Sequence, residues 1–509
     1  MQNKDDVIVV GGGIAGLTAA ALLANEGVSV TLLEAHSQAG GCAGTFRRGE
    51  YTFDVGATQV AGLEPGGSHF RIFQHLNLPM PEAELLDPGC VVDLADGSQP
   101  VRLWHDPLLW QQERKNQFPG SERFWQLCSF IHESNWQFAS SDPVLPIRNG
   151  WDFQQTLAAI NPGNLLSAPL SLLTVKDLLT LSGCARDRRL LKFLDLQLRL
   201  YSQQPADQTA ALYGATVLQM TQSPLGLWHL HGSMQVLSEL LVSGLKREGG
   251  TLLLRHRVRQ LQPISDGSGW QVEVEAPGGK EKIFHAGDVI STLPPQCLPD
   301  LIHPVVSPGK RAMPEPYRRH LKNLDAPSGA LVFYGAIDRK HLPADCPGHL
   351  QRDASDPGSV FLSISREGDG RAPKGQATVI ASVFTSTKGW FPDSETQYQS
   401  KKKECQAKIR YEVEEALGLS DHCWRHQELA TPRGFLHWTG RPNGIVGGLG
   451  QSPSRFGPFG LASRTPLPGL WLCGDSIHPG EGTAGVTLSA LMACRQLMAQ
   501  RGQTFQLSC

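Results

Sequence analysis

Apolar positions at the start of the chain follow the pattern of a strand, a turn and a helix. Residues 7–10 are a short β-prone apolar run, and a glycine-rich segment follows at once. An alanine- and leucine-rich segment continues to Glu26, and Gly27 is placed to end that helix. Residues 28–33 form a second apolar, β-branched run. The pattern therefore predicts a βαβ unit at the N-terminal end.

The middle and the end of the chain carry further patterns of this kind. A helix is predicted from His231 to Glu248 and another from about Ala484 to Met498. Strands are predicted at 251–258, 270–275, 288–292 and 469–472. A chain that leaves the sheet of its N-terminal βαβ unit twice and returns twice must carry insertions between the visits.

The two long stretches between these patterns differ in character. Residues from about 60 to 224 are predicted to be largely helical, whereas those from about 301 to 428 contain apolar runs at 329–334 and 377–384, typical of buried strands. In the first stretch the charged side chains of one helix share a face: Arg189, Lys192, Asp195 and Arg199. Such a helix suits either a membrane interface or core packing with a solvated face.

The glycines of the first turn each have a separate task in nucleotide binding. Gly11 makes the tight turn, Gly13 lets the backbone approach a pyrophosphate, and Gly16 lets helix and strand pack closely. Glu34 ends the second strand, where a carboxylate accepts hydrogen bonds from ribose hydroxyls and repels a 2'-phosphate. The acid argues against NADP and leaves NAD or FAD.

Two later segments favour FAD. A second glycine-rich loop, residues 40–45, follows the ribose acid and suits a chain that tracks along an extended FAD. Near the other end, Gly474 and Asp475 close a strand, and a glycine turn over 477–482 precedes a helix. Asp475 is placed to accept a bond from the ribityl chain, and the helix N-terminus to lie beside the flavin. Each segment alone also fits an ordinary glycine turn.

We therefore expect an α/β fold in which a Rossmann-like FAD-binding domain, of the glutathione-reductase and amine-oxidase type, carries an inserted α+β substrate domain. The FAD-binding domain is expected to be discontinuous, over residues 1–60, 225–300 and 429–509. The substrate domain takes residues 61–224 and 301–428 and is the place for membrane-interface helices.

Composition excludes several other classes. The net charge of the 509 residues is -2, and no basic surface for nucleic acid is indicated. The 11 cysteines are scattered, with no CxxC and no zinc-like spacing, which predicts reduced thiols and no metal site. Cys42 and Cys473 fall in the cofactor segments, as redox thiols or as small buried hydrophobes. Residues 7–24 are uncharged, but Asp5 and Asp6 precede them, so no signal peptide or transmembrane helix is expected.

Taken together, the motifs resemble those of the carotenoid desaturases and isomerases of the phytoene-desaturase type. The segments that carry the resemblance are Gly11–Gly16, Glu34, Gly40–Gly41, Phe53–Gly56, His231–Met234 and Gly474–Gly480. Within that family the chain looks most like cyanobacterial C-3',4' desaturases. It departs from the family at Cys42, where a basic residue is usual, at Ser233 in place of glycine, and at Ala57 in place of proline.

The resemblance implies FAD as cofactor and a set of residues that bind it. These are Gly11, Gly13, Ile14, Ala15, Gly16, Glu34, Ala35, Gly41, Cys42, Val258, Gly474, Asp475, Gly482, Thr483 and Ala484. His478 and Glu481, in the turn expected beside the flavin, are the candidate catalytic residues, as proton acceptor or as stabilisers of charge on the polyene.

It also implies partners and a place in the cell. The substrate would be an apolar carotenoid, the electron acceptor oxygen or a quinone, and the protein would bind the cytoplasmic side of a membrane peripherally. Three alternatives stay open: a carotenoid cis-trans isomerase that uses reduced FAD, a flavin amine oxidase, and a non-catalytic lipid-binding module resembling the Rab GDP-dissociation inhibitors.

Overall fold

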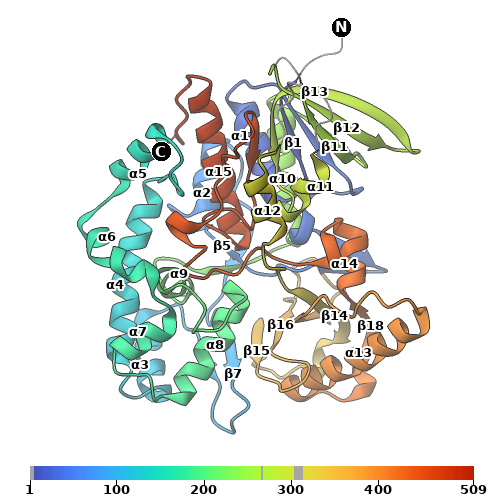
Figure 1. Ribbon diagram of the computed structural model, residues 1–509. Coiled ribbons are helices and arrows are strands. Elements are labelled where there is room, and N and C mark those ends of the chain that lie inside the picture. Colours follow the sequence, from blue (N-terminus) through green and yellow to red (C-terminus); the bar gives the residue numbers. More distant parts are fainter. Residues whose placement is uncertain (1–4, 265–266, 303–312, 509) are drawn as a thin grey trace.

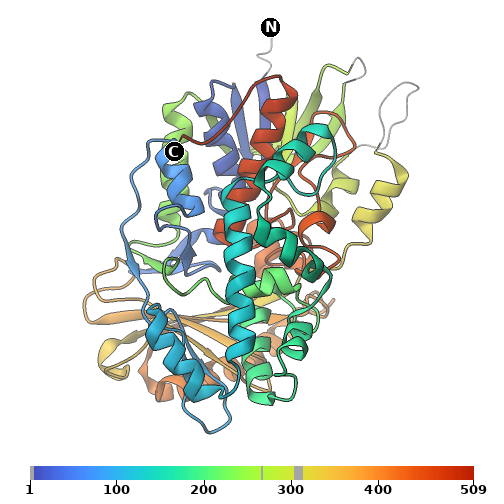
Figure 2. The same cartoon turned by 90° about the vertical axis from the view of Figure 1, so that its left-hand side faces the viewer.

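The computed structural model describes residues 5–264, 267–302 and 313–508. Two sheets form its opposite ends, and helices run along one side of both (Figure 1). Turning the molecule by 90° brings these helices to the front, where α4 (Glu122–Ser140) spans much of the height (Figure 2). Chain segments far apart in sequence therefore face one another across the middle of the molecule.

The first sheet has the strand order β10-β2-β1-β13-β12-β11, with β19 beside β13. Its strands are β1 (Asp5–Val10), β2 (Val30–Glu34), β10 (Thr251–Leu254), β11 (Arg257–Pro263), β12 (Trp270–Ala276), β13 (Lys280–Ser291) and β19 (Leu470–Leu472). Strands β10, β2, β1, β13 and β19 are parallel, whereas β13, β12 and β11 form an antiparallel meander. The central strand β1 is apolar and buried from Val7 onward, as expected of a parallel strand covered on both faces.

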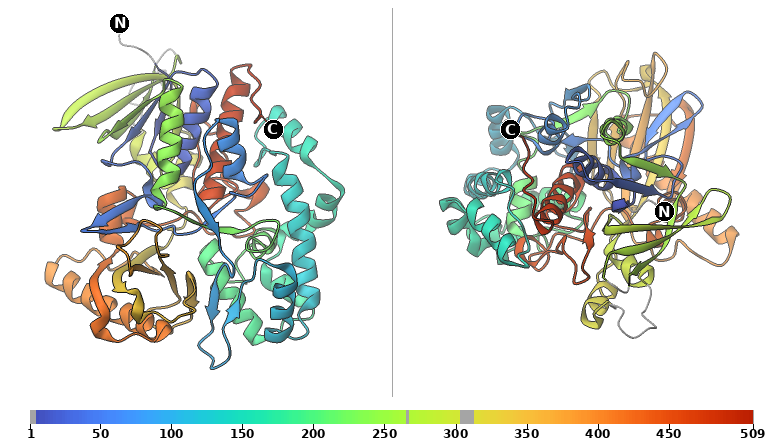
Figure 3. Two further views of the ribbon diagram at one scale, coloured as in Figure 1. Left: turned by 180° about the vertical axis from the view of Figure 1, so that it is seen from behind. Right: turned by 90° about the horizontal axis from the view of Figure 1, so that it is seen from above.

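Three helices pack side by side against this sheet: α1 (Ile14–Asn25), α10 (Gln235–Arg247) and α15 (Gly482–Gln500) (Figure 3, left). They share one apolar core with strands β1 and β2. Helix α1 is buried along nearly its whole length, which explains why its sequence is apolar on every side. The first and last thirds of the chain are thus held together by burial of apolar surface.

The second sheet has the order β18-β14-β17-β16-β15-β7-β8. Its strands are β7 (Val91–Asp93), β8 (Val101–Arg102), β14 (Gly329–Asp338), β15 (His349–Arg352), β16 (Val360–Ile364), β17 (Gln376–Thr385) and β18 (Trp424–Ala430). Helix α13 (Glu395–Leu417) covers one of its faces, and α14 (Pro432–Thr439) follows β18. The expected buried strands at 329–334 and 377–384 are therefore confirmed.

The remaining elements complete the helical side and two small sheets. The helices are α2 (Ser68–His75), α3 (Pro107–Gln117), α5 (Gly150–Ala159), α6 (Pro162–Ser167), η2 (Ala168–Leu172), α7 (Val175–Leu181), α8 (Arg188–Ser202), α9 (Ala211–Val217), α11 (Leu298–Leu301) and α12 (Glu315–Lys322). The small sheets are β3 (Thr45–Arg48) with β4 (Tyr51–Asp54), and β5 (Val60–Ala61) with β9 (Leu227–Leu230) and β6 (Ala83–Leu85).

The structure corrects several predicted boundaries. The single strand predicted over 251–258 is wrong, because Arg255 adopts a left-handed conformation (φ 57°) and separates β10 from β11. Helix α10 starts after Met234, one turn later than predicted. The segment after residue 60 is largely helical as expected, but it also contributes β5 to β8.

The predicted division into two domains stays a prediction. All strands of the first sheet do come from residues 1–60, 225–300 and 429–509, but β18 of the second sheet crosses the predicted boundary at 428.

Candidate functional site

A cavity of about 1880 Å³ lies between the two sheets and the helical side. Its wall combines the glycine turn after β1, residues of α4 and α8, and residues of β14 and β17. Pockets for small ligands typically enclose roughly 300–1,000 Å³. The cavity therefore has room for an extended dinucleotide and a second long molecule in one space.

The first glycine turn lies at one wall of this cavity. A Cβ on Gly16 would overlap the carbonyl oxygen of Gly11, so α1 approaches the turn this closely only because glycine is present. Gly13 lines the cavity, and a Cβ there would meet no described atom within 4 Å. Open space in front of bare backbone at a helix N-terminus suits a phosphate group.

Glu34 projects into the same space from the end of β2. Its Oε2 accepts a hydrogen bond from the backbone N–H of Gly12 (2.6 Å), and its Oε1 accepts one from the N–H of His36 (2.6 Å). Each carboxylate oxygen keeps a further lone pair. The two bonds hold the carboxylate in one orientation and leave lone pairs for the predicted ribose diol.

The second glycine loop touches the first. The N–H of Gly40 donates to the carbonyl oxygen of Gly12 (2.8 Å), and a Cβ on Gly41 would lie 3.2 Å from the Cα of Gly13. Cys42 follows and also lines the cavity. Burial raises the pKa of Cys42, so this thiol is protonated at neutral pH.

The C-terminal corner completes this end of the cavity. Gly474 takes φ 126° after β19, and Asp475 follows it into the cavity wall. Asp475 Oδ2 forms an ion pair with Arg441 Nη1 at 2.9 Å. Sequence reasoning missed Arg441, because it lies in an irregular loop after α14 that carries no periodic pattern or motif.

Glu481 occupies the N-cap position of α15 and faces the cavity. It accepts hydrogen bonds from the side-chain amide of Gln203 and from the backbone N–H of Gly448. Burial, and secondly the charge of Asp475, raise the pKa of Glu481 to about 8. The carboxyl is therefore protonated in most molecules at pH 7 and exchanges its proton in the neutral range.

His478 lies on the same wall, with its ring against that of Phe456 (5.6 Å between centroids). Burial lowers the pKa of His478 to about 4, so its imidazole is neutral at physiological pH. The neutral ring is suited to packing, is a weak proton acceptor, and is unsuited to serving as a resident cation.

The structure brings most of the predicted site residues together. The cavity wall includes Gly11, Gly13, Ile14, Ala15, Glu34, Gly41, Cys42, Gly474, Asp475, His478, Glu481, Gly482, Thr483 and Ala484. Gly16 is not part of the wall, but it allows α1 to pack closely against the turn at Gly11. Ala35 and Val258 lie outside the wall, and Val258 packs in β11 beside the core of the first sheet. Their assignments stay predictions.

The rest of the cavity is largely apolar. Its lining there includes Leu145, Ile160, Leu165, Leu191, Leu196, Leu200, Tyr213, Val217, Met220, Val332, Phe361, Val383, Phe384 and Phe435. These residues come from the helical side, from strands β14, β16 and β17 of the second sheet, and from α14. An elongated apolar molecule would therefore contact both insertions and extend toward Glu481.

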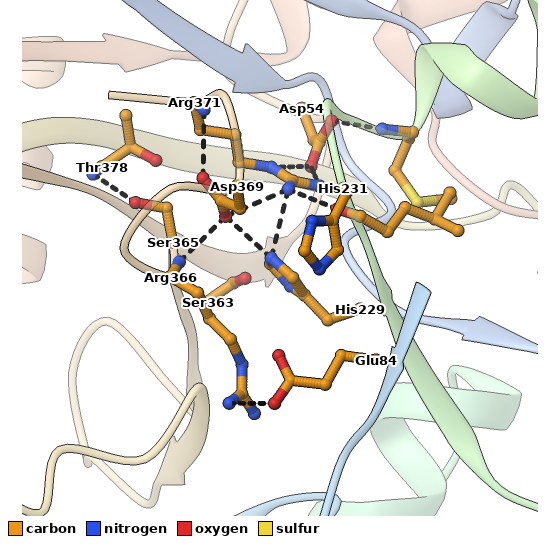
Figure 4. Close-up of polar contacts among 12 residues, drawn as sticks. Asp54, Glu84, His229, His231, Ser363, Ser365, Arg366, Asp369, Arg371 and Thr378 are labelled. Atoms are coloured by element: carbon orange, nitrogen blue, oxygen red, sulfur yellow. Dashed lines mark hydrogen bonds and ion pairs between the residues drawn. The ribbon is translucent and has the colours of Figure 1, made fainter. Parts of the chain in front are cut away.

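A second buried charge cluster lies outside the cavity wall (Figure 4). Arg371 donates through Nη2 to Asp54 Oδ2 (3.0 Å) and through Nη1 to the carbonyl of Leu230 (2.6 Å). Asp369 Oδ2 lies 2.8 Å from His229 Nε2 and 3.2 Å from Arg371 Nη1. Its charged side chains are at most 3% exposed. The cluster connects the loop between β16 and β17 of the second sheet with the end of β4 and with β9.

The geometry fits FAD, since open glycine backbone, a fixed acid at a strand tip and a helix N-terminus line one end of a large cavity. The family model for flavin containing amine oxidoreductases matches residues 14–498. The chain belongs to this family. It is therefore an FAD-dependent oxidoreductase, and the predicted fold class and cofactor are confirmed.

Relatives and solved structures agree with this placement. The chain is 27% identical to a prolycopene isomerase of Arabidopsis thaliana, over 98% of this chain and 84% of that one. It is 26% identical to a phytoene desaturase of Cercospora nicotianae, over 67% of this chain and 52% of that one. The resemblance to carotenoid desaturases and isomerases is thus confirmed.

A structure of a putrescine oxidase double mutant matches with a TM-score of 0.66 at 16% identity, covering 99% of this chain and 100% of that one. A cyclohexylamine oxidase from Brevibacterium oxydans matches with a TM-score of 0.60 at 16% identity, covering 97% and 100%. At these identities the likeness establishes the fold alone.

Proposed function

We propose that this FAD-dependent oxidoreductase acts on a carotenoid and introduces a conjugated double bond at one end of an acyclic or monocyclic polyene, in the manner of a C-3',4' desaturase. The observation that carries the proposal is the apolar cavity, which continues from the glycine turns and Asp475 into a lining of aliphatic and aromatic side chains. A long neutral polyene needs such a lining and few polar anchors. Carotenoid-acting relatives support the same substrate class.

FAD supplies the acceptor for the hydride that leaves an allylic carbon of the substrate. The protein must then remove a proton from the neighbouring carbon, so that the electron pair of that C–H bond forms the new double bond. Glu481 is the residue we assign to this step, because it faces the cavity beside the predicted flavin position. A pKa of about 8 makes its ionised form, which predominates above pH 8, a stronger base than an ordinary carboxylate. Oxygen or a quinone takes the two electrons in a later step.

His478 has a smaller part in this scheme. Its neutral ring packs beside Phe456 at the cofactor end of the cavity, where it shapes the space next to Glu481. The test is to measure the turnover of His478→Ala and Glu481→Gln proteins that both retain FAD. The Glu481 variant is expected to lose most turnover and the His478 variant to lose less. Unchanged turnover in both would remove the pair from the mechanism.

A cis-trans isomerase is the second candidate function, and a specific observation favours it. The relatives that match along 98% of this chain are prolycopene isomerases. Isomerisation uses reduced flavin and consumes no electron acceptor, whereas desaturation must dispose of two electrons per turnover.

The deciding experiment is expression in a host that makes candidate carotenoids, followed by pigment analysis. A red-shifted product that has lost two hydrogens supports desaturation. A change of isomer at constant mass supports the isomerase and contradicts the primary proposal. If the protein carries FAD but neither oxidises nor isomerises any carotenoid offered, both the desaturase and the isomerase proposals are contradicted.

We also propose that the enzyme collects its substrate at a membrane surface. In the described residues no helix is long and apolar enough to span a bilayer. The cavity rim, however, includes Ile160 (42% exposed) and Leu165 (67%), and Leu166 (70%) stands beside them. Exposed leucines that adjoin an apolar cavity suit a lipid interface.

Vesicle flotation tests this surface. Leu165→Asp/Leu166→Asp is expected to lower binding to vesicles containing anionic lipid, because charge is costly at the acyl boundary. Leu108→Asp/Leu109→Asp on α3 is the matched control, since these leucines are exposed (75% and 49%) but lie outside the cavity wall. Equal binding by both variants would contradict the proposed surface.

A further inference from the structure

Arg441 lies at the cofactor end of the cavity, among groups that are otherwise acidic or neutral. Its Nη1 pairs with Asp475, its Nε donates to the carbonyl of Ile445 (3.1 Å), and its Nη2 donates to the carbonyl of Gly447. A guanidinium carries five N–H donors. Three are used in the described contacts, and two are left for a ligand.

Arg441 is also the least exposed cationic side chain among the described residues of the cavity wall. Its side chain is 13% exposed, against 39% for Lys192, and Arg188, Arg199 and Lys388 are exposed. Burial would lower the pKa of Arg441, but the charge of the neighbouring Asp475 carboxylate raises it above its usual value. Arg441 therefore keeps its charge inside a site of low polarity.

The negative charge that enters this site is large. The pyrophosphate of FAD adds about two charges to those of Glu34 and Asp475, and like charges in a poorly solvated site repel strongly. The N-termini of α1 and α15 offset part of this charge. Arg441 lies where the rest is needed, since it pairs with Asp475 and lines the same cavity as Gly11 and Gly13.

We infer that Arg441 is a cofactor-binding residue, whose guanidinium holds Asp475 in place and balances the charge of the FAD pyrophosphate. The inference adds a residue to the cofactor site and concerns FAD retention alone. It is independent of which carotenoid is bound or which reaction is catalysed, so its failure leaves the proposed function untouched.

The test measures FAD release from purified holoprotein, through the fluorescence of free flavin on dilution and dialysis at low and high salt. Arg441→Gln keeps hydrogen bonding to the loop carbonyls but removes the charge, and it is expected to weaken FAD retention by at least about tenfold. Arg441→Lys restores the charge and is expected to recover part of that loss. Arg433→Gln, at an exposed arginine that pairs with Glu395 outside the cavity wall, is the control and is expected to match the unaltered protein.

Salt sharpens the result. Retention by the unaltered protein should fall as salt screens the charge pair, and retention by Arg441→Gln should fall less steeply. The inference is overturned if Arg441→Gln retains FAD within about twofold of the unaltered protein while its circular dichroism is unchanged. It is also overturned if Arg441→Lys behaves as Arg441→Gln, because geometry rather than charge would then hold the cofactor. If Arg441→Gln fails to fold, FAD retention by Arg441→Lys and by the unaltered protein is compared at low and high salt. A similar fall with salt in both proteins supports the inference, and no fall with salt in either overturns it.

Discussion

Two buried charge networks lie between the sheets of this protein, and they differ in what surrounds them. Around Arg371, the partners are protein groups on all sides, and both carboxylate oxygens of Asp54 are engaged. Around Arg441, the partners form one side only, and the other side is the cavity. A closed network stabilises a single arrangement of the chain, whereas an open one leaves donors and a titrating acid for a ligand.

The difference teaches where altered residues should affect folding and where they should affect chemistry. Removing one member of the closed network leaves a buried charge uncompensated. Removing one member of the open network leaves a charge that cofactor, substrate or water in the cavity can reach. The predictions below test this contrast, beginning with the largest expected effect.

Arg371→Met should destabilise the protein by about 3–5 kcal/mol, because Asp54 and Asp369 would lose their shared cation in a dry site. Denaturant unfolding of the holoprotein measures this loss. The control is Arg48→Met, whose ion pair with Glu428 has side chains 47% and 29% exposed and should contribute at most about 1 kcal/mol. Similar losses in the two variants would contradict the closed-network account.

Glu481→Gln should lower turnover by roughly 100-fold while FAD stays bound, since a positioned proton acceptor contributes roughly 10²- to 10⁴-fold. Initial rates of pigment conversion, divided by the bound FAD, measure the effect. Glu428→Gln, on the far strand β18, should keep full turnover. A rate for Glu481→Gln within threefold of the unaltered protein would exclude the carboxylate as the acceptor.

The rate should also depend on pH through Glu481. As proton acceptor the residue must be ionised, so kcat/KM should rise about tenfold per pH unit below pH 8 and level off above it. The Glu481→Gln protein should lack this rise. A profile that is flat in both proteins between pH 6 and 9 would show that another group, or none, takes the proton.

Stability should change with pH in the opposite sense. The folded-state pKa of Glu481, about 8, lies above the ordinary value of 4.5, so the folded chain holds this proton where the unfolded chain has lost it. The free energy of unfolding therefore falls between pH 4.5 and 8 and is constant above that window. Glu481→Gln should melt a few degrees higher than the unaltered protein at pH 8 and at the same temperature at pH 4.

The smallest effect is expected at Cys42. Its thiol is protonated and lines the cavity from the second glycine loop, and it has no assigned part in proton or hydride transfer. Cys42→Ser should change stability by less than about 1 kcal/mol and leave turnover within twofold. A loss of turnover after mild oxidation of the unaltered protein, absent in Cys42→Ser, would instead identify Cys42 as a redox thiol.

The sequence predicted those parts of the molecule in which the determining residues are neighbours in the chain. The βαβ unit, both glycine turns and the Asp475 corner follow from apolar periodicity and from glycines at fixed spacing. The strand break at Arg255 depends on one left-handed residue, which such patterns do not contain. Arg255 lies in the short link between β10 and β11, which stand at opposite ends of the strand order of the first sheet.

The charge networks were beyond sequence reasoning for a different reason. Arg371 meets Asp54 across 317 positions, and Gln203 meets Glu481 across 278. Each partner alone is an ordinary polar residue in a loop or at the end of a helix or strand. The tertiary fold brings the loop after β16 to the end of β4 and the end of α8 to the start of α15, so the roles of these residues depend on tertiary structure.

The shared cavity has one further consequence. A single continuous space would hold both the dinucleotide and the proposed polyene, so a bound flavin would form part of the wall against which the polyene packs. Occupation by either one should then slow the escape of the other, and by reciprocity the two affinities must change by the same factor. Apoprotein would present a site that is too wide at its deep end, so a polyene should be held loosely until the dinucleotide is in place.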